Sequence, residues 1–210
     1  MSRRLAGLLI AAIALTATIA LLYPGRGARG LSLGSAYAAY SLVVWALVIG
    51  PTNVLRQRPN PVHGAYRRDV GIAAGLFSVA HTVVGLQVHA GGVLSRYFLP
   101  SKEHASASNS VFLFANWVGL LSVIAFAVLV AISNNLSLRS MGLRTWKLIQ
   151  RGAYPAAVLA TVHGLAYQLL EKRSLLMLAA IIATAFFVVA LQIAGMRARL
   201  RTSHAAARPS

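Results

Sequence analysis

Two of the six histidines lie deep inside long apolar stretches of the sequence. His81 stands in a stretch that begins near Val70, and His163 stands in another that begins near Gly152. An ionisable side chain surrounded by apolar residues is costly, and such residues usually serve a function. Three others, His63, His104 and His204, lie in loops or the tail, where solvated surface is the ordinary environment.

The residue types around these two histidines restrict the chemistry they can perform. The chain has no cysteine, which excludes disulfides, iron–sulfur clusters and thiolate chemistry. The apolar stretches also contain no Asp or Glu, so a carboxylate-bridged metal site or a carboxylate proton relay is poorly supported. Two imidazoles from different helices can instead hold a planar metal cofactor between them, as in bis-imidazole ligation of haem iron.

The elements that must position the histidines are membrane-spanning helices. The chain of 210 residues is 58% hydrophobic and 11% charged, against about 25% charged residues in an ordinary soluble domain. Six stretches are free of Asp, Glu, Lys and Arg, and each can hold the roughly 20 apolar residues that cross a bilayer as a helix. The sequence therefore predicts an all-α integral membrane protein, a six-helix transmembrane bundle with spans near 5–23, 33–50, 70–92, 111–132, 149–170 and 174–196.

The distribution of basic residues predicts the orientation of this bundle. With the N-terminus inside, 14 of the 20 Lys and Arg residues fall in inner segments, so both termini are expected to be cytoplasmic. The basic residues behind the net charge of +17 are then expected to attract anionic lipid, or to form a docking surface for an acidic partner. No nucleic-acid partner is expected. We expect an integral protein of the bacterial inner (cytoplasmic) membrane.

The two ends of the chain carry separate predictions. The basic start followed by an apolar run is similar to a secretory signal, but the run is long and lacks a clear cleavage site, which favours a retained first span. Residues 197–210 are predicted to form a basic, disordered cytoplasmic tail. No nucleotide-binding domain is expected in this chain, so a nucleotide-using partner would be another chain.

The two spans that carry the histidines run in the same direction, so their depths can be compared. His81 lies 11 residues after Val70 and His163 lies 14 after Ile149, which gives depths of roughly 16 and 21 Å. The two imidazoles should therefore be level in the outer half of the bilayer. Mostly small side chains share their helical faces and leave room for a flat ring; they are Ala74, Ser78, Gly85, Ala156, Ala160 and Tyr167.

Two alternatives remain for these histidines and their neighbour. Each imidazole could simply form a hydrogen bond between helices, as polar residues in spans often do. His89 lies eight residues after His81, about 12 Å further along a helix, too far to share a metal with it. It is expected to be an interfacial histidine, with a contact to a propionate or a substrate at the outer surface as the second reading.

A resemblance to a known family adds to this interpretation. The segment from Arg67-Arg68 through Gly71 to His81 resembles the Arg-Arg-x-x-Gly start and haem-ligand histidine of the ferric reductase-like transmembrane domain family. The later segment is similar to that family's loop and fifth-span ligand helix at Ser133-Asn134, Arg139, Gly142, Arg144, Trp146 to Tyr154, and His163. The pattern is closest to single-module bacterial members, of the kind that form the haem-binding membrane subunit of a periplasmic methionine sulfoxide reductase system.

The resemblance implies a cofactor and a function. It implies b-type haem held between the third and fifth spans by His81 and His163, with Ser78, Gly85, Ala160 and Tyr167 as pocket residues. In two-haem members a second ligand pair lies deeper, but here those positions hold Arg67 and Gln150, so one haem is expected. The implied function is electron transfer across the bilayer, from quinol or a separate flavoprotein to an outer acceptor, with quinone or flavin supplied by a partner redox protein or larger membrane complex.

Two other functional classes remain open. A haem-free accessory subunit would pack against a larger membrane complex without redox chemistry of its own. A small transporter ranks lowest, because no span shows the interruption that midplane substrate sites usually require.

Overall fold

The chain folds into helices throughout the part that the structure describes. The computed structural model describes residues 2–23, 27–57, 65–99 and 107–206, and no strand occurs in those ranges. The helices, in chain order, are α1 (Arg3–Leu22), α2 (Ala28–Leu55), α3 (Ala65–Gly85), the short 3-10 helix η1 (Ala90–Gly92), α4 (Leu94–Phe98), α5 (Ala107–Ala131), α6 (Asn135–Gln150), α7 (Ala153–Leu170) and α8 (Leu175–Ala206).

Four helices are long and apolar enough to cross a membrane. They are α1, α2, α5 and α8, with qualifying segments Arg3–Leu22, Ala28–Leu55, Asn109–Ala131 and Leu175–Thr202. The two helices that carry His81 and His163 are shorter or more polar. α3 opens with Arg67, Arg68 and Asp69, while α7 has 18 residues and includes His163 and Gln168. An all-helical protein with apolar, membrane-length helices is therefore confirmed.

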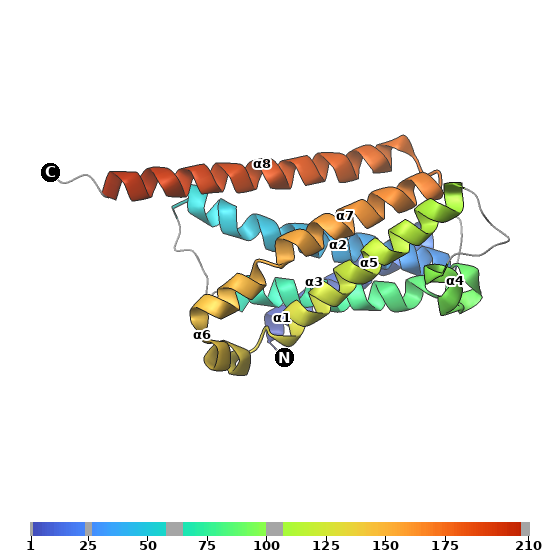
Figure 1. Ribbon diagram of the computed structural model, residues 1–210, viewed down its shortest axis with the longest axis horizontal. Helices are drawn as coiled ribbons and strands as arrows, with labels where there is room; N and C mark the ends of the chain where they lie inside the picture. Colours follow the sequence, from blue (N-terminus) through green and yellow to red (C-terminus); the bar gives the residue numbers. More distant parts are fainter. Residues whose placement is uncertain (1, 24–26, 58–64, 100–106, 207–210) are drawn as a thin grey trace.

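The long helices lie side by side along the molecule, with α2 at the centre (Figure 1). α2 packs against α1, α3 and α8 and touches α7, while α5 packs against α3 and α7. Half of the apolar segment of α2 is buried, compared with 6% for α1 and 11% for α8. α1 and α8 therefore cover the outside, and α2, α3, α5 and α7 surround the interior.

Small side chains let the inner helices approach one another closely. The most buried apolar residues include Ala38 on α2, Ala73 and Ala74 on α3, and Ala156 on α7, each no more than 2% exposed. Gly75 lies against Phe126 and Val130 of α5, so a side chain there would collide with the neighbouring helix. Gly75 thus marks a close approach of α3 and α5.

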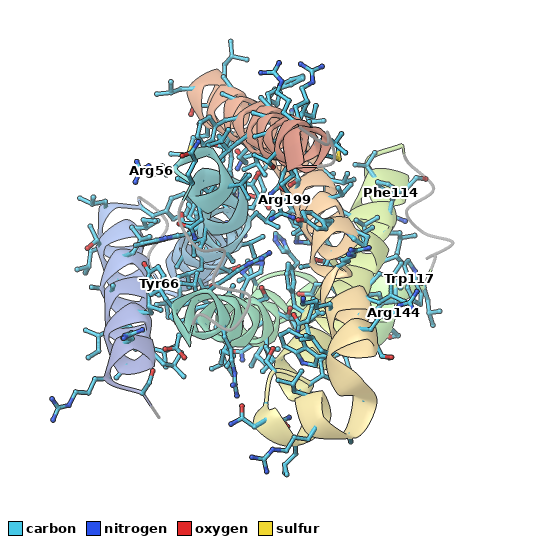
Figure 2. All side chains as sticks on the ribbon, turned by 90° about the vertical axis from the view of Figure 1, so that its left-hand side faces the viewer. Arg56, Tyr66, Phe114, Trp117, Arg144 and Arg199 are labelled. Atoms are coloured by element: carbon cyan, nitrogen blue, oxygen red, sulfur yellow. The ribbon has the colours of Figure 1, made fainter. Side chains whose placement is uncertain are left out.

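Large apolar side chains cover the outer surface. Phe114 and Trp117 on α5 are 55% and 47% exposed and lie on the outer side of the helix assembly (Figure 2). Leu21, Leu176 and Phe186, on α1 and α8, are more exposed still. Such an apolar exterior suits contact with lipid, because exposing so many large apolar side chains to water is unfavourable.

The two ends of the helix assembly differ in charge, and both chain termini approach the same end. Ser2 Oγ donates a hydrogen bond to Asp69 Oδ2 at the start of α3, at 2.7 Å, and Gly195 of α8 packs against Pro51 near the end of α2. Arg56, Arg144 and Arg199 also lie at this end, which faces the viewer in Figure 2. We call it the basic end, and the opposite end, where α3 and α7 stop, the cavity end.

Several helix boundaries differ from the sequence prediction, and α2, for example, runs over Ala28–Leu55 where a span near 33–50 was expected. α3 stops at Gly85 although a span through residue 92 was expected, because Tyr97 Oη hydrogen-bonds to carbonyl oxygens of Leu86 and His89 and holds the chain in a turn. α8 continues through Ala206, ten residues past the expected end of the span, because its Arg- and Ala-rich sequence favours helix. Residues 135–150, expected to be a loop up to residue 148, form α6.

Candidate functional site

His81 and His163 meet between the inner helices. Their ring centroids are 6.2 Å apart and the ring planes are inclined at 70°. His81 comes from α3 and His163 from α7, with α2 on one side of the pair and α5 on the other. The structure thus brings the two imidazoles to one level, as the depth comparison predicts.

Hydrogen bonds from the flanking helices orient both imidazoles in the same way. His81 Nδ1 lies 3.0 Å from the carbonyl oxygen of Ser32 and 3.3 Å from Ser35 Oγ, both on α2. His163 Nδ1 lies 2.8 Å from the carbonyl oxygen of Ala115 on α5. A carbonyl can only accept, so each ring carries its proton on Nδ1 and keeps the lone pair of Nε2. This arrangement is typical of histidines that bind a metal through Nε2.

Gly119 makes room for the second of these contacts. A Cβ atom at this position would lie 2.5 Å from His163 Nδ1 and 2.7 Å from its Cε1. Real Cβ atoms do not approach other atoms so closely, so any side chain at residue 119 would displace the imidazole. The glycine on α5 therefore fixes where His163 can sit.

A cavity of about 410 Å³ surrounds the two histidines. This volume lies within the range of about 300–1,000 Å³ found for small-molecule and cofactor sites. The four pocket residues predicted with the histidines all line it; they are Ser78, Gly85, Ala160 and Tyr167. Ala74 and Ala156 instead lie buried in the helix packing. The cavity lining is mostly apolar and includes Leu33, Val43, Phe126 and Ile181.

Tyr167 joins the histidine pair to the end of the cavity. Its ring centroid is 4.9 Å from that of His163 and 5.7 Å from that of His89. Its hydroxyl donates to Asn116 Oδ1 at 2.7 Å, and Asn116 Nδ2 reaches the carbonyl oxygen of Tyr97 at 3.3 Å. The polar tip of Tyr167 is thereby satisfied inside an otherwise apolar wall.

His89 occupies a different place from the one its sequence position predicts. Because α3 ends at Gly85, the chain turns and His89 lines the cavity at 27% side-chain exposure, rather than continuing two helical turns outward. Its Nε2 lies 3.3 Å from Glu171 Oε1. Burial lowers the pKa of His89 below its ordinary value, although the Glu171 carboxylate acts in the opposite direction. The contact brings the imidazole and the carboxylate together at the cavity end.

Polar atoms without partners lie at the same end of the cavity. In the part of the chain that the structure describes, Arg173 Nε and Gln168 Oε1 are buried and have no hydrogen-bond partner. Both residues line the cavity, as does Arg29 near the start of α2. Buried polar groups are nearly always satisfied, so such atoms indicate a place where another polar group belongs.

The positions expected for a deeper ligand pair show no comparable site. Gln150 Nε2 donates to Ser133 Oγ at 3.2 Å, in the turn between α5 and α6. The guanidinium of Arg67 lies against Gly50 of α2, and neither Arg67 nor Gln150 lines the cavity. His63 and His104 lie outside the described residues, and His204 stands near the end of α8 with no side-chain placement described.

Several residues of the site have only a weak signal in the sequence. Ser32 and Ser35 on α2 and Ala115 on α5 lie on inner helices that carry no histidine. Ser32 and Ala115 act through backbone carbonyls, which every residue possesses. Gly119 is one of 17 glycines. Asn116, a polar residue inside an apolar span, is the one that a search for unusual residues could have found.

The donor set offers two imidazoles to a metal carried by a macrocycle. Among the described residues, no group of three or more His, Cys, Asp or Glu side chains could hold a metal ion. The two imidazoles, with ring centroids 6.2 Å apart and an Nε2 lone pair on each, would supply the pair of nitrogen ligands that bis-histidine haem sites use. The two rings, the apolar cavity and the unpaired Arg173 atom are together compatible with a b-type haem. No protein-family model and no curated protein matches this chain.

Proposed function

We propose that this protein is a membrane b-type cytochrome subunit. It would carry electrons across the bilayer through one haem with His81 and His163 as axial ligands, from quinol or a separate flavoprotein to an acceptor on the outer side. The observation that carries the proposal is the pair of imidazoles, 6.2 Å apart, with both Nδ1 atoms turned to backbone carbonyls. The resemblance to the ferric reductase-like transmembrane domain family supports the same function.

The topology that goes with this function has all six long helices crossing the membrane. α3 and α7 then cross inside a shell of more apolar helices, which suits their lower hydropathy. Both termini approach the basic end, and the positive-inside rule places that end in the cytoplasm, in a bacterial inner membrane. The histidine pair and the cavity end then belong to the outer half of the bilayer.

The chain's own residues would perform three tasks. His81 and His163 supply the two protein ligands, and the carbonyl oxygens of Ser32 and Ala115 keep their Nε2 lone pairs available. The apolar wall formed by residues such as Leu33 and Phe126 excludes water and keeps the local dielectric low. A bound haem supplies one-electron redox chemistry, and the protein tunes it through these ligands and their hydrogen bonds.

One haem per chain is the expected stoichiometry. Arg67 and Gln150 hold the positions where a second ligand pair would be required, and neither faces the cavity. The electron donor, quinol or a flavoprotein, and the electron acceptor would lie outside this chain, and a partner redox protein or a larger membrane complex would supply any flavin or quinone.

Measuring the haem content of the purified full-length protein tests the proposal. Protein from haem-replete cells should be coloured, should show a reducible low-spin b-type spectrum, and should give a pyridine haemochrome ratio near one per chain. A colourless preparation that is folded and membrane-derived would favour a haem-free accessory subunit, in which His81 and His163 only join helices through their hydrogen bonds. A ratio near two would mean that further ligands exist, with His63 and His89 the first to examine.

A further inference from the structure

The turn at the end of α7 places the positively charged side chain of Arg173 beside the cavity. The helix closes in a Schellman turn, in which the backbone N–H of Arg173 donates to the carbonyl of Gln168 and that of Lys172 to the carbonyl of Leu169. Lys172 takes the left-handed conformation that this turn requires, with φ of 47°. The chain therefore doubles back, so that the Arg173 side chain lines the cavity while Lys172 is exposed.

Arg173 carries an unused donor in this position. Its Nε is buried and has no hydrogen-bond partner among the described residues. Arg173 lines the same cavity as His81 and His89. A buried guanidinium donor without a partner is unfavourable, and a carboxylate is the acceptor that best matches its geometry.

The neighbouring charges leave this end of the cavity positive. Arg29 and Arg173 both line it, and Glu171 is the one acidic lining residue described. The Glu171 carboxylate is already engaged by His89, at 3.3 Å. The two arginines are therefore not neutralised by the described side chains around them, and the charge balance favours an anionic group.

Resting on the proposed function, we propose that Arg173, assisted by Arg29, is a carboxylate subsite that holds the propionate edge of the haem. A b-type haem is apolar over most of its rim and carries two carboxylates on one edge. The cavity has the same polarity, with Leu33, Val43 and Phe126 in its wall and the two arginines at the cavity end. The subsite thus sets the direction of the ring: its carboxylates face the end where α7 stops.

Competition between haem and its dimethyl ester tests this subsite, because the ester has the same ring and iron but no carboxylate charge. Apoprotein of the full chain, made in haem-deficient cells, is loaded with either form, and ligand loss to excess apomyoglobin is followed by absorbance. The wild type should retain haem at least about tenfold longer than the ester, the factor expected for a charge-assisted hydrogen bond. Arg173→Gln should lose most of this preference.

Lys172→Gln is the matched control, since it removes a neighbouring positive charge that does not line the cavity. It should keep the wild-type preference. Arg173→Gln should retain the ester as long as the wild type does, which would show that the variant is folded. A shorter retention of haem alone would then support the subsite.

Three outcomes would overturn the inference. If the wild type does not distinguish haem from its ester, or if Arg173→Gln keeps the full preference, haem binding stands but the carboxylate subsite is wrong. If Lys172→Gln loses the preference as fully as Arg173→Gln does, general surface charge is responsible. A wild type that retains neither form would refute the proposed function together with the subsite.

Discussion

The two ends of the inner helices use similar small residues to opposite effect. Towards the basic end, Ala73, Ala74 and Ala156 are at most 2% exposed, and the helices close on one another. Towards the cavity end, Ser78, Gly85 and Ala160 line a cavity of about 410 Å³. Small side chains therefore permit close packing or an opening, and the bulky neighbours decide which one forms.

The neighbours that keep the cavity end open are polar and aromatic. His163, Tyr167 and His89 form a continuous group of rings, and their polar atoms bond to α5 and to Glu171. Each of these bonds holds a ring against the wall, so the rings do not fill the centre. At the basic end Gln150 and Arg68 bond to the turn after α5 instead, and they leave the helix interior to alanines.

The largest expected effect comes from removing either histidine at the cavity end. His81→Ala or His163→Ala should abolish or severely reduce haem incorporation, since each supplies one of two protein bonds to the iron. Gln150→Ala, at the basic end, and His89→Ala should leave the reduced-minus-oxidised spectrum of the purified protein largely intact. If both ligand variants keep a normal low-spin spectrum while remaining in the membrane, the bis-histidine site is wrong.

A smaller but still large effect is expected from a single methyl group at residue 119. In Gly119→Ala the new Cβ would lie 2.5 Å from His163 Nδ1, so the imidazole must move and its bond to the Ala115 carbonyl weakens. Altering such a supporting contact typically costs about 10–100-fold in metal affinity, which haem titration of the apoprotein would measure.

Gly71→Ala is the matched control for that substitution. A Cβ at Gly71, near the start of α3, meets nothing within 4 Å. This variant should bind haem normally and gain about 0.5–1 kcal/mol in stability, because alanine favours helix. Equal haem affinities for the two variants would contradict the positioning of His163 by residue 119.

The smallest effect is expected from removing one hydroxyl. Tyr167→Phe breaks the 2.7 Å hydrogen bond to the buried Asn116 and should lower the free energy of unfolding by about 1–3 kcal/mol. Tyr154→Phe, near the basic end, removes an exposed contact of 3.4 Å to Gln192 and should change little. Thermal unfolding followed by circular dichroism would compare them. A larger loss of unfolding free energy for Tyr154→Phe than for Tyr167→Phe would contradict the greater contribution of the buried hydrogen bond.

Parts of the site could be predicted because their signals are local. An ionisable side chain in an apolar stretch stands out in any sequence, so His81 and His163 were found, and helical spacing placed Ser78, Gly85, Ala160 and Tyr167 beside them. The depth comparison worked because both helices rise by the same distance per residue. His89 was misplaced by the same reasoning, which assumed that α3 continued beyond Gly85.

The sequence by itself determined the class of the protein: long apolar stretches must become helices, because a backbone in lipid has to satisfy its own hydrogen bonds. It also determined which side chains could perform chemistry. The tertiary structure alone decided how they are held. The positions of the Ser32 and Ala115 carbonyls and the space at Gly119 depend on contacts between helices far apart in the chain, and those contacts have no residue signature of their own.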